Sequence, residues 1–167
     1  MTAKFNLLLT TPEHETAIEG LLNRTLGPGR FARMAERLRE HNRPLEELCF
    51  VALDAQGGLA GSIAHWPINI GDTPALLLGP LVVASDLQGQ GAGRALMTHA
   101  LDVARQLEHR LVLLVGDAAY YGPVGFQPCA APLACPGPVD PARLLVCPLV
   151  AGAADNLSGA LMPARRC

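Results

Sequence analysis

The chain has 167 residues, of which 50% are hydrophobic, and its formal net charge is −2. This length is enough for one domain with a sizeable core, so we expect a single domain over residues 1–167. A charge this close to neutral provides no basic surface for nucleic acid or for an anionic membrane, and we expect neither as a partner.

The N-terminus and the cysteines indicate the compartment. Residues 1–10 lack the apolar core and the cleavage site of a signal peptide, and no apolar run reaches the roughly 18 residues of a membrane span. The five cysteines form no closely spaced pair, which favours reduced thiols. Cys129 and Cys135 lack nearby Cys or His partners, so we predict no metal site. The sequence therefore predicts a cytoplasmic protein.

The first part of the chain predicts one strand and two helices. Phe5–Thr10 is expected to be a strand. A helix is expected to begin at Thr11-Pro12-Glu13, with an acidic side chain in its first turn, and to end at Gly27-Pro28-Gly29. A second helix is expected over Arg30–His41.

A hairpin is expected next. Leu48–Leu53 and Leu59–Ile70 read as antiparallel strands, and Asp54–Gly58 between them has the composition of a turn. Asp72-Thr73-Pro74 then turns the chain into a long apolar run.

The stretch Leu76–Leu107 organises the chain. Its apolar run is interrupted by Gly79-Pro80 and is followed by the glycine-rich loop Gln88–Gly93. A helix follows the loop, and a strand–loop–helix unit of this kind directs free backbone N–H groups at an anion. The residues expected on the buried face of this helix are Leu96, Met97, Ala100, Leu101, Ala104 and Leu107.

The glycine loop differs from the common nucleotide-binding loops. No Gly-Lys-Ser/Thr follows it, which excludes a nucleoside triphosphate loop. Gly89, Gly91 and Gly93 also do not follow the G-x-G-x-x-G spacing of a dinucleotide fingerprint.

The remainder of the chain predicts two further strands. Leu111–Val115 should pair in parallel with the central strand, because a helix connects the two. Gln127–Pro141 is proline-rich and is expected to be extended or looped. Leu144–Val150 reads as a last strand, and Leu157–Leu161 is a candidate extended segment.

The segment Gln88–Gly93 resembles the Q/R-x-x-G-x-G/A loop of the GNAT (N-acetyltransferase) superfamily, and the resemblance covers residues 74–127. Ala119–Phe126 also occurs in the family's order and is similar to the YhbS-like branch. The resemblance implies an α/β (α+β) fold: a mixed central β-sheet of about six to seven strands flanked by helices. It also implies that a bulge at Gly79-Pro80 splays two parallel strands to form the acetyl-CoA slot.

The resemblance implies an enzyme that moves an acetyl or other short acyl group from acetyl-CoA to a primary amine, by direct transfer in a ternary complex and without a metal. The acceptor is a small molecule or a protein amine that the sequence does not name. Homodimers are common in the family, and the apolar C-terminal third leaves room for one. The residues that the resemblance places at acetyl-CoA are Leu81, Val82, Val83, Gln88, Gly89, Gln90, Gly91, Ala92, Gly93, Arg94, Asp117 and Tyr121.

The resemblance also implies a catalytic acid. In the family, a tyrosine five positions before the phenylalanine of the Gly-Phe motif protonates the sulfur of the coenzyme. Counting back from Phe126 gives Tyr121, and a phenol is protonated at neutral pH and able to donate. Tyr120 is expected to pack, although a short helix would exchange the two roles. Asp117 either replaces an asparagine that contacts pantetheine in the family or caps the helix.

The general base is only weakly indicated. His65 lies on a predicted strand, and histidine is the usual base at neutral pH. We favour a satisfied or exposed structural histidine, with ordered water taking the proton of the amine. Cys129, the cysteine nearest the motif, is a rival nucleophile that we do not favour.

The second predicted helix helps to wall the acceptor site in the family, and its arginines have two interpretations. They recognise an acidic acceptor, or they form a solvated helix face balanced by Glu36 and Glu40. We favour the solvated face. The arginines are Arg30, Arg33, Arg37 and Arg39.

Two other functions remain as alternatives. One is a non-catalytic acyl-CoA-binding or sensing module of the same fold, which an intact Tyr121 argues against. The other is a nucleotide-binding domain that uses the glycine loop for another phosphate ligand.

Overall fold

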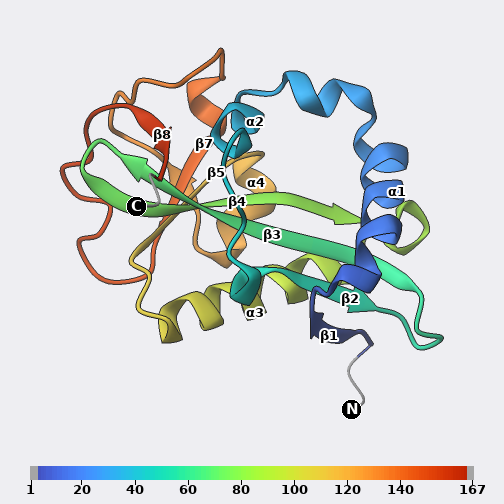
Figure 1. Ribbon diagram of the computed structural model, residues 1–167. Helices are drawn as coiled ribbons and strands as arrows, with labels where there is room; N and C mark the ends of the chain where they lie inside the picture. The colour runs from blue at the N-terminus through green and yellow to red at the C-terminus, as the bar shows by residue number, and fades with distance from the viewer. Residues whose placement is uncertain (1–3, 165–167) are drawn as a thin grey trace.

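The computed structural model describes residues 4–164, and these residues form an eight-stranded mixed sheet with helices on both faces (Figure 1). The strands are β1 (Asn6–Leu9), β2 (Phe50–Leu53), β3 (Leu59–Ile70), β4 (Thr73–Val83), β5 (Leu111–Val115), β6 (Gln127–Pro128), β7 (Leu144–Pro148) and β8 (Leu161–Pro163). Their order is β1-β2-β3-β4-β5-β7-β6, with β8 paired to β3 beyond the end of β2. β4 and β5 are parallel, as predicted, and the other neighbouring strands are antiparallel.

Two hydrophobic layers hold the sheet between its helices. The α-helices are α1 (Glu15–Leu26), α2 (Met34–Arg39), α3 (Ala92–Gln106) and α4 (Ala118–Tyr121). Successive residues of β5 point into different layers, as expected for a strand. Val112 and Leu114 pack with α3, whereas Leu111 and Leu113 pack with α2 and the C-terminal strands. Within residues 4–164, no helix is both long and apolar enough to cross a membrane.

Short 3₁₀ turns connect several of these elements. They are η1 (Pro12–His14), η2 (Pro28–Ala32), η3 (Glu46–Leu48), η4 (Ser85–Leu87), η5 (Gly122–Val124) and η6 (Pro141–Arg143). The prediction of a continuous second helix over Arg30–His41 is wrong, since η2 and α2 divide this stretch at an extended residue, Arg33. In this stretch only Met34 and Leu38 are buried in the core, so burial stabilises little more than one helical turn.

Three smaller predictions also need correction. Leu48 belongs to η3, so the second strand begins at Phe50. The strand predicted to reach Val150 ends at Pro148. Leu107 is 46% exposed instead of buried, because α3 ends at Gln106 and the chain turns away at the next residue.

The parallel pair β4–β5 opens toward one end of the sheet. The two strands pair only at Leu76–Val112 and Leu77–Leu113, although β4 continues to Val83. The β3–β4 register shifts at Gly79-Pro80, a cis peptide, because these two residues lie opposite a single residue of β3. The predicted bulge and splayed parallel strands are therefore both present.

Candidate active site

The smaller of two neighbouring cavities lies where the glycine loop meets the free end of β4. Its volume is about 550 Å³. The predicted acetyl-CoA residues that line it are Leu81, Val82, Val83, Gln88, Gly89, Gly91, Ala92, Gly93, Arg94 and Tyr121. Since these residues come from β4, the loop, α3 and α4, the fold assembles most of the predicted site in one place.

The glycines keep the loop open above the first turn of α3. Gly89 and Gly91 have φ angles of +76° and +97°, a conformation that other residues rarely adopt. A Cβ atom at either position would meet no heavy atom within 4 Å. The backbone of the loop is therefore accessible at the N-terminus of a 15-residue helix, which is a favourable place for an anionic group.

Two residues of the predicted set lie outside the smaller cavity. The side-chain amide of Gln90 donates to the carbonyl oxygen of Asp86 at 3.3 Å. Asp117 caps α4, because its Oδ1 accepts the N–H of Ala119 at 2.9 Å, and it lines the neighbouring cavity. Of the two interpretations of Asp117, the structure therefore supports the helix cap.

Tyr120 and Tyr121 stand where the two cavities meet and line both. Their rings pack edge to face with centroids 4.9 Å apart. The ring of Tyr121 lies directly over Gly116, where a Cβ atom would collide with it. The hydroxyl of Tyr120 lies over Gly93 at the start of α3. Glycine at both positions thus lets the two rings approach the backbone closely.

Burial keeps both phenols protonated. It raises the pKa of Tyr121 to about 12; the neighbouring Tyr120 adds to this effect and the positive charge of Arg143 opposes it. Burial also raises the pKa of Tyr120. A phenol with a raised pKa is a proton donor throughout the neutral range.

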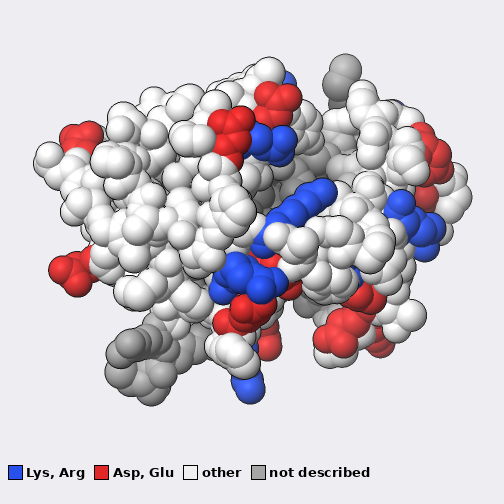
Figure 2. Space-filling model, turned by 90° about the horizontal axis from the view of Figure 1, so that it is seen from above, with Lys and Arg blue, Asp and Glu red and all other residues white. Residues whose placement is uncertain are grey.

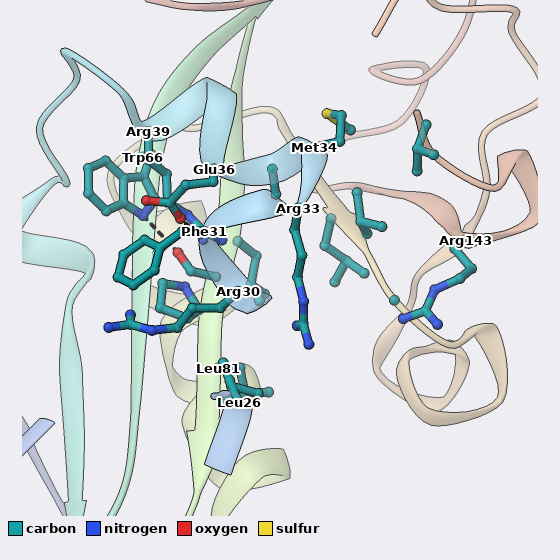
Figure 3. Close-up of a pocket in the computed structure, with 18 of the residues that line it drawn as sticks. Leu26, Arg30, Phe31, Arg33, Met34, Glu36, Arg39, Trp66, Leu81 and Arg143 are labelled. Carbon is teal, nitrogen blue, oxygen red and sulfur yellow. Dashed lines mark hydrogen bonds and ion pairs between the residues drawn. The ribbon is translucent and has the colours of Figure 1, made fainter. Parts of the chain in front are cut away.

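The larger cavity has a volume of about 860 Å³ and opens beside the bulge of β4 (Figure 3). The α1–α2 segment forms one wall, and the ends of β4 and β5 form the floor. Residues 138–143 form the opposite wall. Leu81 and both tyrosines line this cavity as well as the smaller one, so the two spaces meet at the splayed strands.

Three of the four arginines considered from the sequence line the larger cavity, namely Arg30, Arg33 and Arg39. Figure 2 shows basic side chains around the central hollow of this face, with carboxylates beside several of them. The side chains of Arg30 and Arg39 are only 11% and 15% exposed. These two side chains are therefore not solvated as predicted, although Glu36 does balance Arg39, at 3.1 Å. The predicted solvated face fits Arg37, which is exposed and pairs with Glu40 at 3.0 Å, and Arg33 is exposed as well.

Comparison with known proteins places the chain in a family. A model of the acetyltransferase (GNAT) family matches residues 16–126. The chain belongs to this family. Escherichia coli K12 contains a relative, the uncharacterized N-acetyltransferase YhbS, that is 30% identical over 118 residues, which is 70% of each chain. The predicted superfamily, its YhbS-like branch and the class of enzyme are confirmed.

Solved structures agree with this assignment to the GNAT family. A crystal structure of Escherichia coli YhbS in complex with CoA matches with a TM-score of 0.80 at 25% identity, over 98% of this chain and 92% of that chain. A Brucella melitensis GNAT family acetyltransferase in complex with acetyl-CoA matches with a TM-score of 0.60 at 24% identity, over 84% and 94% of the two chains. The predicted GNAT fold is therefore confirmed.

His65 of this GNAT chain lies away from both cavities. It is completely buried, with Nδ1 2.9 Å from the carbonyl oxygen of Leu48 and with no partner for Nε2. Burial lowers its pKa to about 4. Because the ring lines neither cavity, the structure does not bring this histidine to a position from which it could take a proton from an acceptor. One of its two ring nitrogens is hydrogen-bonded, which agrees with the prediction that His65 has a structural role.

The cysteines of the described segment 4–164 are free thiols, as predicted. Cys129 donates to the carbonyl oxygen of Ala131 and lines neither cavity, so it is not placed as a nucleophile. No group of three or more metal-ligating side chains occurs in this part of the GNAT domain.

Sequence reasoning missed several residues that line the cavities. Leu26 lies at the boundary of both cavities, and Trp66 and Arg143 line the larger one. These residues are distant in the sequence and belong to no motif. For Leu26, the one available signal was its place at the end of the predicted first helix.

Proposed function

We propose that this chain transfers the acetyl group of acetyl-CoA to the primary amine of a small acceptor, with the donor in the smaller cavity and the acceptor in the larger. The observation that carries the proposal is the meeting of the two cavities at Leu81 and the two tyrosines, beside the splayed strands. Two reactants held on either side of this point would react as an oriented pair. Membership of the GNAT family and the CoA bound to the related YhbS structure support acetyl-CoA as the donor.

The smaller cavity fits the chemistry of acetyl-CoA. The backbone from Gln88 to Gly93, Gln90 included, and the first turn of α3 offer N–H groups to a pyrophosphate. Leu81–Val83 have no β5 partner and leave backbone groups free for an amide-containing arm. Arg94 lines the same cavity and adds a positive charge. Bound acetyl-CoA supplies an acyl group that is activated as a thioester.

The residues of the chain orient the acetyl group and move one proton. The nitrogen of the acceptor forms a C–N bond to the acetyl carbon, the C–S bond breaks, and the phenol of Tyr121 protonates the departing thiolate. Backbone N–H groups of Leu81–Val83 stabilise the oxyanion that develops in between. Ordered water takes the proton of the amine, and no covalent enzyme intermediate forms. Asp117 contributes indirectly, because its cap holds the short helix that carries Tyr121.

The test is thiol release from acetyl-CoA in the presence of a panel of primary amines, with the product identified by a mass increase of one acetyl group. The proposal requires release that depends on both the enzyme and the amine, and an acetylated amine as the product. Tight binding of acetyl-CoA without turnover of any amine would instead indicate the acyl-CoA-sensing module. A homodimer stays a prediction that light scattering of the same sample will check.

A further inference from the structure

Two arginines of the larger cavity come from opposite walls and reach toward the same space. Arg33 is the extended residue between η2 and α2, and Arg143 ends η6. Figure 3 shows both guanidinium groups extending into the cavity, one from each side. Arg30 extends in a different direction. Arg33 and Arg143 are 110 positions apart in the chain, so only the fold brings them together.

The other arginines of this cavity are already neutralised. Arg30 pairs with Glu19 at 2.6 Å, and Arg39 pairs with Glu36 at 3.1 Å. The guanidinium of Arg39 lies against Gly79 at the bulge, where a Cβ atom would be 2.8 Å from it. Both arginines therefore form part of the cavity wall and already have a carboxylate partner.

Arg33 and Arg143 differ from these pairs, because neither forms an ion pair with any carboxylate of residues 4–164. The nearby lining carboxylates Asp117 and Asp140 each accept a backbone N–H at 2.9 Å as the cap of a short helix. Burial lowers the pKa of Arg39, and the positive charges of Arg33 and Arg30 add to this effect. The positive charge of Arg143 is felt at Tyr121, where it opposes the rise in pKa caused by burial. Two arginines without an ion-pair partner among residues 4–164 therefore flank the space beside the proposed acid.

We infer that the acceptor is a small primary amine that also carries an anionic group, a carboxylate or a phosphate, and that Arg33 and Arg143 bind this group. The inference rests on the proposed function and names its substrate class. A guanidinium presents paired N–H donors that match the oxygens of either anion. Anchoring of the anion near Arg143 would leave the amine of the same molecule free to reach the junction beside Tyr121.

The size of the cavity favours a small molecule over a protein amine. Its volume of about 860 Å³ lies within the range of roughly 300–1,000 Å³ that is typical of small-molecule sites. Its lining is mixed, with Phe31, Trp66 and Val139 among the polar groups. A short carbon chain between the amine and the anion would contact these apolar side chains.

The experiment compares matched acceptors that differ only in the anionic group. ω-Amino carboxylates are paired with their amides, and aminoalkyl phosphates with the corresponding amino alcohols. Acetylation is followed by thiol release and by mass spectrometry, for the native chain and for Arg33→Gln, Arg143→Gln and the double variant. Arg43→Gln is the matched control, because Arg43 is exposed and lines neither cavity. Calorimetric titration of each protein with acetyl-CoA verifies the donor site separately.

The inference requires an anionic acceptor to exceed its neutral partner in kcat/KM by about tenfold or more, the ratio expected for a charge-assisted hydrogen bond. Each Arg→Gln change should remove most of this preference by raising KM for the acceptor, with kcat and acetyl-CoA affinity retained. A comparison of the amino carboxylates with the aminoalkyl phosphates shows which of the two anionic groups the acceptor carries.

Several results would overturn the inference. The enzyme could acetylate the neutral and the anionic acceptor of each pair equally well, or it could acetylate only neutral or polycationic amines and no anionic acceptor. A preference for anionic acceptors that remains in the Arg33→Gln, Arg143→Gln double variant would also contradict the inference. In each of these cases intact acetyl-CoA binding would leave the donor half of the proposed function standing. Loss of acetyl-CoA binding in the native chain would remove the proposed function and this inference together.

Discussion

The indole Nε1 of Trp66 donates a hydrogen bond of 2.7 Å to the carbonyl oxygen of Gly79. Trp66 belongs to β3, and Gly79 is the first residue of the β4 bulge. The bond thus connects β3 to the bulge of β4. The bulge lies just past Leu77, the last residue of β4 that pairs with β5. It satisfies a buried carbonyl group that the register shift removes from regular pairing.

We expect Trp66→Phe to destabilise the fold by about 1–3 kcal/mol, because the Gly79 carbonyl would lose its donor in a buried position. Acetyl-CoA affinity should fall as well if the bulge relaxes. Chemical denaturation and calorimetry measure the two effects. Phe31→Leu is the control, since Phe31 is an exposed aromatic residue in the same cavity. An unchanged free energy of unfolding would show that the bulge does not depend on this bond.

The two tyrosines should differ in their effect on turnover. Tyr121→Phe removes the proposed acid while keeping the ring over Gly116, and we expect kcat to fall by about 100-fold or more. Tyr120→Phe keeps the packing and should retain most of the activity. Steady-state kinetics with acetyl-CoA and an acceptor from the panel measure both. A large loss in Tyr120→Phe with near-native Tyr121→Phe would assign the acid to Tyr120.

The high pKa of Tyr121 predicts the alkaline side of the pH profile. Since burial raises this pKa to about 12, the phenol stays protonated across the range in which the enzyme can be assayed. We therefore expect no alkaline decline in kcat from ionisation of this residue. A decline with a midpoint near the ordinary tyrosine pKa of about 10, lost in Tyr121→Phe, would contradict this expectation.

His65 should make the stability of the fold depend on pH. Its pKa is lowered from 6.5 to about 4 in the folded state, so between these values the unfolded chain binds more protons. Stability from this residue is complete above about pH 6.5 and is lost as the pH falls toward 4, by up to about 3 kcal/mol. Urea unfolding across this range measures the loss. His65→Gln should flatten most of the profile and leave the contribution of His109, whose pKa burial also lowers, while replacement of the exposed His41 by Gln is the control.

The parts of the fold that could be predicted are those encoded by neighbouring residues. Gln88–Gly93 is a local motif between a strand and a helix, and its sequence predicted the anion-binding loop that borders the smaller cavity. The bulge at Gly79-Pro80 was predictable for the same reason, because proline cannot donate a hydrogen bond to a neighbouring strand.

The larger cavity depends on the fold and could not be read from local patterns. Arg33 and Arg143 line the same cavity because β5 and β7 pair and place η6 opposite the α1–α2 segment. The predicted helix over Arg30–His41 was wrong because composition does not reveal that only Met34 and Leu38 reach the core. The burial of His65 likewise depends on Leu48, 17 positions away.

The most direct test of the donor site is calorimetric titration with acetyl-CoA, coenzyme A and ATP, repeated on Gly91→Glu and Gly57→Glu. Both glycines have positive φ and open space around them, but Gly57 lies in the β2–β3 turn, away from both cavities. The two variants therefore share the backbone strain and the added charge. We predict micromolar binding of both coenzymes and none of ATP, lost in Gly91→Glu and kept in Gly57→Glu. Absence of coenzyme binding, or binding that tolerates a carboxylate at Gly91, would contradict the assignment of the smaller cavity to acetyl-CoA.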